Sequence, residues 1–181
     1  MKPGARIASA MEALEDMETN WAEGGRAPAD ALLNQYFRQR RFIGSKDRGE
    51  ISRVVYAVLR NEAALNWQLD HGGLPSDPRG RVLAEAVLLG GAGLEDMKAL
   101  CDRQQYCPPR LSEPELDWIK QQAGQPLLAA AMPPSVRHHF PEWLTPRLES
   151  VLGDQLPAAM AALNEEASVD LRVNTLKTSR D

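Results

Sequence analysis

The sequence predicts an all-α protein in which only the last residues depart from the helical pattern. Apolar side chains recur every three or four residues from Ile7 to about position 125, which is the period of amphipathic helices. Strand-like alternation of apolar and polar residues is almost absent before residue 168. Alanine and leucine are abundant, and a chain of 181 residues is long enough to bury a hydrophobic core. We therefore expect a bundle of about six or seven helices over residues 5–125.

Glycine and proline mark the ends of the first two helices. The first is expected over residues 5–22 and ends at Gly24-Gly25. Pro28 opens the second helix, and Gly44 ends it. Ser45 then offers a side-chain oxygen that can cap a third helix. The apolar stripes that define the first two helices comprise Ile7, Met11, Leu14, Met17, Trp21, Leu32, Leu33, Tyr36 and Phe37.

The third helix, expected over residues 46–70, separates apolar from basic side chains. Because each residue turns a helix by about 100°, Lys46, Arg53 and Arg60 project within about 40° of one another. One face of this helix is therefore predicted to enter the core, and the other to be accessible to phosphate. The apolar face comprises Ile51, Val54, Val55, Val58, Leu65 and Leu69.

Two charged residues of the third helix do not follow this division. Arg48 and Glu62 both project toward the apolar arc. Charges are tolerated near a core only when they are paired and hydrogen-bonded. We therefore expect both side chains to be held in hydrogen bonds and to serve the structure. Glu85 on the next helix is among the candidate partners of Arg48.

The remaining helices of the bundle have clear start and stop signals. Asp77-Pro78 begins a helix that Gly90-Gly91 ends. A shorter helix is expected over residues 94–102. Ser112-Glu-Pro-Glu115 combines an N-cap, a capping-box glutamate and a proline in the first turn, and Gly124 ends the helix that follows.

Residues 126–140 are expected to link the bundle to a C-terminal segment, residues 141–181. Two short amphipathic helices are predicted in that segment, one closed by Gly153 and one over residues 156–163. A strand is predicted next, because apolar and polar residues alternate. A lone strand has no partner for its backbone donors and acceptors, so it must belong to a larger sheet. The segment is therefore predicted to be the truncated start of a small α/β domain. The apolar residues of the predicted strand are Val169, Leu171 and Val173, and Thr178 or Ser179 offers an N-cap for a helix after it.

The net charge of −4 conceals a basic region. Residues 34–60 contain seven arginines and lysines but only two acidic residues, so this window carries about +5 and the rest of the chain about −9. A local basic patch, rather than the overall charge, attracts phosphate. The alternative is that these residues form an ordinary solvated helix face.

Several residue types that often form catalytic or metal sites have simpler explanations here. Gly90-Gly-Ala-Gly93 follows a helix rather than a strand, so it predicts a turn and not a cofactor loop. Cys101 and Cys107 give no disulfide framework and are interpreted as core or loop residues of a reduced, cytoplasmic protein. The adjacent His138 and His139 cannot easily face one ion, so no metal site is predicted. No membrane span is predicted either.

The four tryptophans allow two interpretations. Tryptophan can stack on unpaired bases, but Trp21, Trp118 and Trp143 lie on apolar helical faces, which favours packing in the core. Trp67 lies nearer a flank of the third helix, so its environment is left open.

Five segments resemble a known family. Phe140–Gly153, Ala161–Glu166 and Leu171–Thr178, which contains Leu-Arg-Val-Asn, resemble the region that leads into the catalytic domain of the RsmB/Sun (Fmu) family. These are S-adenosylmethionine-dependent RNA 5-methylcytosine methyltransferases. Arg41–Arg48 and Val54–Asn61 are similar to the NusB-like helical domain at the N-terminus of members of this family. The resemblance implies a NusB-like bundle over residues 1–125 and the start of an N1-like pre-catalytic domain after residue 140.

The family's chemistry requires groups that this chain does not offer. The resemblance implies a cysteine thiolate that adds to cytosine and a glycine-rich loop that holds S-adenosylmethionine. Cys107-Pro108 inverts the Pro-Cys order of the family motif and lies in the wrong domain. We therefore predict no catalytic and no cofactor-binding residue in this chain, and expect S-adenosylmethionine to bind a separate catalytic domain.

The preferred interpretation is the RNA-recognition region of an rRNA 5-methylcytosine methyltransferase. Its expected partners are RNA, with rRNA favoured by the family, and its own methyltransferase domain. One alternative is a free-standing NusB-type transcription antitermination factor, against which the Leu-Arg-Val-Asn sequence argues. Another is a docking domain without an RNA-binding role. The predicted RNA-binding residues are Arg38, Arg40, Arg41, Lys46, Arg53, Arg60, Arg172 and Asn174.

Overall fold

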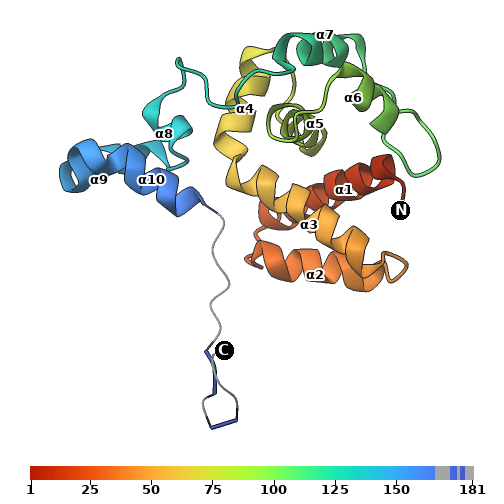
Figure 1. The fold of residues 1–181 in the computed structure, drawn as a ribbon, viewed down its shortest axis with the longest axis horizontal. Coiled ribbons are helices and arrows are strands. Elements are labelled where there is room, and N and C mark those ends of the chain that lie inside the picture. The colour runs from red at the N-terminus through yellow and green to blue at the C-terminus, as the bar shows by residue number, and fades with distance from the viewer. Residues whose placement is uncertain (166–171, 175, 178–181) are drawn as a thin grey trace.

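Seven helices form the N-terminal bundle, as the sequence predicts (Figure 1). The computed structural model describes residues 1–165, 172–174 and 176–177, and all regular structure in these residues is helical. None of the helices in these residues has the length and apolar character needed to cross a membrane. The bundle helices are α1 (Pro3–Ala22), α2 (Ala29–Gln39), α3 (Ser45–Arg60), α4 (Glu62–His71), α5 (Pro78–Leu88), α6 (Leu94–Leu100) and α7 (Glu113–Gln122).

Helix α5 is the centre of the bundle. All its residues from Gly80 to Leu88 are buried, and α1, α3, α4, α6 and α7 pack around it (Figure 1). Asp77 caps its start, because the Asp77 side chain accepts a hydrogen bond from the Gly80 amide at 2.7 Å. A helix that is apolar on most sides is typical of a buried central element. The charged side chains on α5 therefore need partners on the surrounding helices.

The predicted third helix is two helices that meet at Asn61. The Asn61 side chain donates a hydrogen bond to the Ala57 carbonyl at 2.9 Å, and the Asn61 backbone leaves the helical conformation, with φ −107° and ψ 15°. An asparagine that bonds back to the preceding turn competes with the helical ladder. The prediction of one helix over 46–70 is therefore wrong. The predicted cap also shifts by one residue, because Gly44 is the N-cap and Ser45 is the first helical residue.

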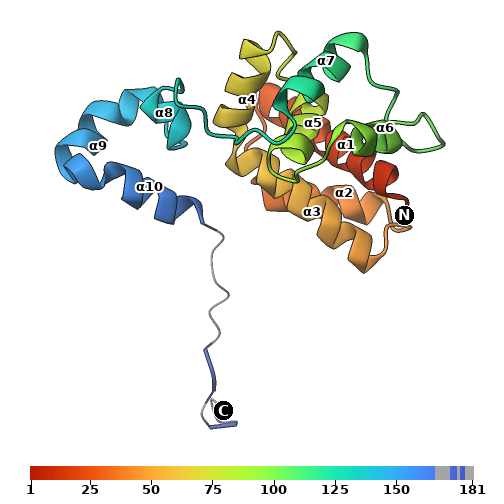
Figure 2. The ribbon, with the colours of Figure 1, turned by 45° about the horizontal axis from the view of Figure 1, so that its top comes forward.

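The segment after the bundle contains α8 (Pro134–Arg137), α9 (Thr145–Leu152) and α10 (Leu156–Asn164), with 3₁₀ turns over Glu142–Leu144 and Gly153–Gln155 (Figure 2). The two helices predicted in this segment correspond to α9 and α10. Most of the predicted strand lies outside the described residues, and 172–174 have no strand assignment.

The stretch between the bundle and α9 packs onto the bundle. Leu127 and Met132 are buried in the bundle core, with 7% and 5% of their surface exposed. The Gln68 side-chain amide on α4 also donates a hydrogen bond to the Leu127 carbonyl at 2.7 Å. This connection fixes the start of the C-terminal segment against α4.

Only one of three tryptophans predicted to pack in the core is fully buried. Trp118 is 3% exposed, whereas Trp21 is 37% and Trp143 is 73% exposed. The prediction is therefore wrong for Trp21, whose indole donates a hydrogen bond to the Ala27 carbonyl instead, and for Trp143. Trp67 is half-buried and stacks on His71, with ring centroids 3.6 Å apart.

Candidate nucleic-acid interface

Four exposed cations form what we call the basic surface: Arg38, Arg41, Lys46 and Arg60. Arg38 is in the last turn of α2, Arg41 is in the α2–α3 turn, and the other two lie near opposite ends of α3. None of the four makes an ion pair with another described residue. These charges are therefore available to a partner in solution.

Helix α3 holds two of these cations on a rigid support. Ile51 and Val55 on its opposite face are fully buried, so the helix cannot rotate without exposing core residues. At a rise of about 1.5 Å per residue, Lys46 and Arg60 are about 21 Å apart along the helix axis. A separation of this size suits an extended anion better than a small one.

Arg40 differs from these four because its charge is already engaged. Its guanidinium donates a hydrogen bond to Glu12 at 2.5 Å and stacks over the Tyr36 ring at 3.8 Å. Partial burial opposes ionisation of Glu12, but hydrogen bonds from Arg40 and Tyr36 outweigh it and lower the pKa of Glu12. Burial, together with the bond to Glu12, raises the pKa of Tyr36 to about 12. Arg40 thus joins α2 to α1.

Arg53 is exposed but compensates a buried carboxylate. Its guanidinium lies 3.2 Å from the Glu85 side chain of α5 and 3.7 Å from Glu50. Only 2% of the Glu85 side chain is exposed, against 59% of Arg53. Burial raises the pKa of Glu85, and the charge of Arg53 works against that shift. Arg53 therefore stabilises the bundle by compensating Glu85, although its side chain is on the surface.

Arg48 and Glu62 are held in hydrogen bonds, as predicted, but the expected partner of Arg48 is wrong. The Arg48 guanidinium donates to the Ile43 carbonyl at 2.8 Å, and Glu62 accepts from Arg81 at 3.0 Å. Arg48 is at the start of α3, so it reaches the α2–α3 turn rather than α5. Glu85 pairs with Arg53 instead.

Arg172 and Asn174 belong to the C-terminal stretch and are exposed. The Asn174 side-chain oxygen accepts a hydrogen bond from the Leu176 amide at 3.1 Å. Both views place this stretch apart from α2 and α3 (Figures 1 and 2). The structure therefore does not bring these two residues to the basic surface.

The described residues offer no activated nucleophile. Burial raises the pKa of the Cys101 thiol to about 11, so it is protonated at neutral pH. Burial and Asp102 also raise the pKa of Cys107. Within 1–165, 172–174 and 176–177, no group of three or more His, Cys, Asp or Glu side chains is placed to hold a metal ion.

A groove that the sequence analysis missed lies near the basic surface. It has a volume of about 890 Å³ and runs between the start of α1, the α2–α3 turn and the loop that follows α6. Phe42 and Tyr106 line it, together with Lys2 and Arg40. Neither aromatic residue belongs to a helical stripe, so periodicity gave no signal for them.

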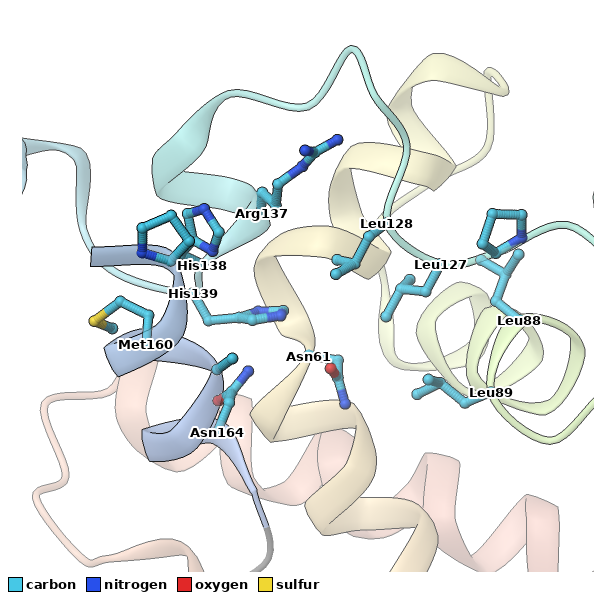
Figure 3. Close-up of a pocket in the computed structure, with 13 residues that line it drawn as sticks. Asn61, Leu88, Leu89, Leu127, Leu128, Arg137, His138, His139, Met160 and Asn164 are labelled. Carbon is cyan, nitrogen blue, oxygen red and sulfur yellow. The ribbon is translucent and has the colours of Figure 1, made fainter. Parts of the chain in front are cut away.

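A second cavity, of about 660 Å³, lies where Asn61 at the α3–α4 junction and the end of α5 face the C-terminal part of the chain (Figure 3). Leu88, Leu127 and Met160 give it an apolar lining, and His139 projects into it. Burial, and next the neighbouring His138, lower the pKa of His139, so its ring is neutral at pH 7. The cavity is a junction between two parts of the chain, and its polar lining residues are Asn61, Arg137, His138, His139 and Asn164.

The C-terminal part of the chain is similar to a described domain family. Residues 140–181 match the family model described as "Methyltr_RsmF/B-like, ferredoxin-like domain". No curated protein and no solved structure matches the chain. The match covers the segment in which the sequence resemblance to the RsmB/Sun family is most specific, and it relates this segment to RsmF/B-like methyltransferases.

Proposed function

We propose that this chain is the substrate-recognition region of an S-adenosylmethionine-dependent rRNA 5-methylcytosine methyltransferase. In this proposal the NusB-like bundle binds RNA phosphates, and a separate catalytic domain transfers the methyl group. The match of residues 140–181 supports the methyltransferase relationship. It also argues against a free-standing NusB-type factor, which does not need a ferredoxin-like domain.

The observation that carries the RNA-binding role is the basic surface. Arg38, Arg41, Lys46 and Arg60 are exposed and make no ion pairs with other described residues, although the chain as a whole is acidic. Clustered cations without protein partners are the electrostatic footprint of phosphate binding. Arg40 and Arg53 belong to the same stretch of chain, but their charges are paired with Glu12 and Glu85 and hold α1 and α5.

The described residues do not fit S-adenosylmethionine. Gly90–Gly93 joins α5 to α6, and Gly91 has a φ of 69°, so these glycines make a turn between two helices. A nucleotide-type cofactor is normally held where a strand leads into a helix. The proposal therefore assigns the cofactor to the catalytic domain of the parent protein.

A salt titration of RNA binding tests the proposal. We expect the 181-residue chain to bind a short rRNA hairpin weakly and without methyl transfer. With four phosphates engaged, log K should fall against log salt concentration with a slope of about −3. Replacing Arg38, Arg41, Lys46 and Arg60 with glutamine should flatten this slope. Each cation that is removed means that about one fewer counterion is released from the RNA on binding.

A control variant with the same change in net charge isolates the position of these cations. Arg26, Lys98, Lys120 and Arg147 are cationic residues outside the basic surface, and their replacement with glutamine should leave the slope near −3. Equal slopes in the two variants would show that the basic surface is a solvated face. The bundle would then be better described as a docking domain for its own enzyme.

A further inference from the structure

Two large aromatic rings are exposed in the groove defined above. Phe42 is 79% exposed and Tyr106 is 76% exposed, yet both line the same groove. Exposing rings of this size to water is unfavourable, and grouped exposed apolar side chains usually mark a binding site. Both views place the α2–α3 turn, the N-terminus and the loop after α6 on the same side of the bundle (Figures 1 and 2).

The turn that carries Phe42 is anchored on both sides. Ile43, the next residue, is 1% exposed and packs in the core. Its amide donates to the Arg40 carbonyl at 3.0 Å, and its carbonyl accepts from Arg48 at 2.8 Å. The backbone at Phe42 is therefore fixed, and its ring projects from a constrained turn rather than from a flexible loop.

Tyr106 lies on an equally constrained loop. Its backbone has a φ of 70°, and the next amide, of Cys107, donates to the Gln104 carbonyl at 2.9 Å. A Cβ atom on Gly4 would lie only 2.8 Å from the Cys107 sulfur, so helix α1 approaches this loop too closely for any side chain at that position. Pro108 is buried and continues the attachment.

Small and cationic residues complete the groove. Ala5 and Ala8 of α1 are among its lining residues and leave room between the two rings. Lys2 supplies positive charge at the lining, where Arg40 is paired with Glu12, and Arg41 of the basic surface directly precedes Phe42 in the chain. The volume of about 890 Å³ is within the range of sites that hold a small organic group.

We propose that this groove binds unpaired RNA bases, with Phe42 and Tyr106 as stacking surfaces. The inference rests on the proposed RNA-binding function and adds the class of substrate, namely RNA with single-stranded nucleotides. Exposed aromatic rings beside cations are the combination by which proteins hold unpaired bases and their phosphates. A protein partner is disfavoured because Arg41, a cation of the basic surface, directly precedes Phe42 in the chain, and an exposed ring beside an unpaired cation suits a polyanion.

The test compares two RNAs that carry equal numbers of phosphates, one a hairpin with an unpaired loop and one a complete duplex. The hairpin carries 2-aminopurine in its loop to report stacking by quenching of its fluorescence. The variant combines Phe42→Ala with Tyr106→Asn, because asparagine tolerates a positive φ. Trp143→Ala is the matched control, since it removes another exposed aromatic ring outside the groove.

We expect the double variant to bind the hairpin about five- to a hundredfold more weakly, as for the loss of base stacking. Its salt slope and its duplex affinity should be unchanged, because the cations remain, and the quenching should disappear. Thermal melting checks that the variant is folded, and a second variant that retains the rings, Phe42→Tyr with Tyr106→Phe, should bind like the wild type.

Two results would overturn the inference while leaving the RNA-binding function intact. One is unchanged hairpin affinity in the double variant, even though the basic surface variant loses its salt slope. The other is a wild-type dimer in sedimentation that the double variant lacks, which would assign the rings to contact between copies. Absence of RNA binding by the wild-type chain would instead refute both proposals.

Discussion

At the scale of single residues, the two ion-pair systems around α5 differ in which partner is buried. In one, the Glu85 carboxylate is 2% exposed and the Arg53 side chain is 59% exposed. In the other, Arg81 is the buried member, at 6%, and binds Glu18 and Glu62, which are 40% and 49% exposed. Removing an exposed partner leaves a buried charge uncompensated, whereas removing a buried one returns its partners to water. Loss of an exposed partner is therefore the damaging change in both systems, but Arg81 keeps a second carboxylate when one is removed, whereas Glu85 depends on Arg53.

Arg53→Gln should lower the free energy of unfolding by about 1–3 kcal/mol at pH 7, because Glu85 keeps its buried charge without a cation. Burial raises the folded-state pKa of Glu85 above its ordinary value of 4.5, so the folded state binds this proton more tightly than the unfolded state. Stability from this group is present below that value and is lost as pH rises through the raised pKa. The loss in the variant should therefore grow with pH in urea unfolding.

Two further variants check that interpretation. Arg60→Gln removes an exposed cation of α3 without a carboxylate partner among the described residues, and should change stability by less than about 0.5 kcal/mol. Adding Glu85→Gln to Arg53→Gln should abolish the added pH dependence. A loss that is independent of pH would contradict the role of Glu85.

At the scale of helices, glycine has opposite effects at two positions. Gly49 lies inside α3, and a Cβ atom there would meet no other atom within 4 Å. Gly72 ends α4, and a Cβ atom there would overlap the Trp118 indole. That indole is buried and donates a hydrogen bond to the Gln68 carbonyl at 3.3 Å, so it cannot easily move aside. The close approach of α4 and α7 therefore depends on glycine.

Gly49→Ala should stabilise the protein by about 0.5–1 kcal/mol, because alanine loses less backbone entropy in a helix. Gly72→Ala should destabilise it by about 1–3 kcal/mol through overpacking against Trp118. Thermal unfolding of both variants provides the measurement, and each is the control for the other. If Gly72→Ala were neutral, the packing of α7 on α4 would have to differ from that described.

At the scale of the whole molecule, the C-terminal segment is attached through the stretch that follows α7. Leu127 is buried among residues of the bundle core, whereas the adjacent Leu128 is 44% exposed. Gln68 holds the Leu127 carbonyl, and α8 packs against α4. This attachment forms one side of the cavity in Figure 3. It precedes residues 140–181, the segment that is similar to the RsmF/B-like domain.

Leu127→Ala should cost about 2–4 kcal/mol of unfolding free energy, because a buried leucine leaves a cavity. Leu128→Ala, at the neighbouring exposed position, should cost less than about 1 kcal/mol. Urea unfolding gives the free energy of unfolding of both variants, and so compares the same substitution at a buried and at an exposed position. Equal effects would indicate that this stretch is a free linker, as the sequence analysis expected for residues 126–140.

Much of the helical architecture could be predicted because its signals are local. Glycine and proline boundaries, the Ser112 capping box and the 3.6-residue period depend only on neighbours in the chain. The same period separated Lys46 and Arg60 from Ile51 on α3, and the structure agrees. The helical period failed at Asn61. The apolar stripe continues across this position and predicted one helix, but the Asn61 side chain donates a hydrogen bond to the Ala57 carbonyl and competes with the helix.

Tertiary structure alone decided which charges are free and where the groove lies. Arg40 and Arg53 look like the other basic residues in sequence, but Glu12 and Glu85, supplied by distant helices, engage them. Phe42 and Tyr106 come from separate turns and share a groove only because α1 packs between them. Periodicity reports the environment of one helix at a time, whereas ion pairs and grooves depend on which segments the buried core brings together.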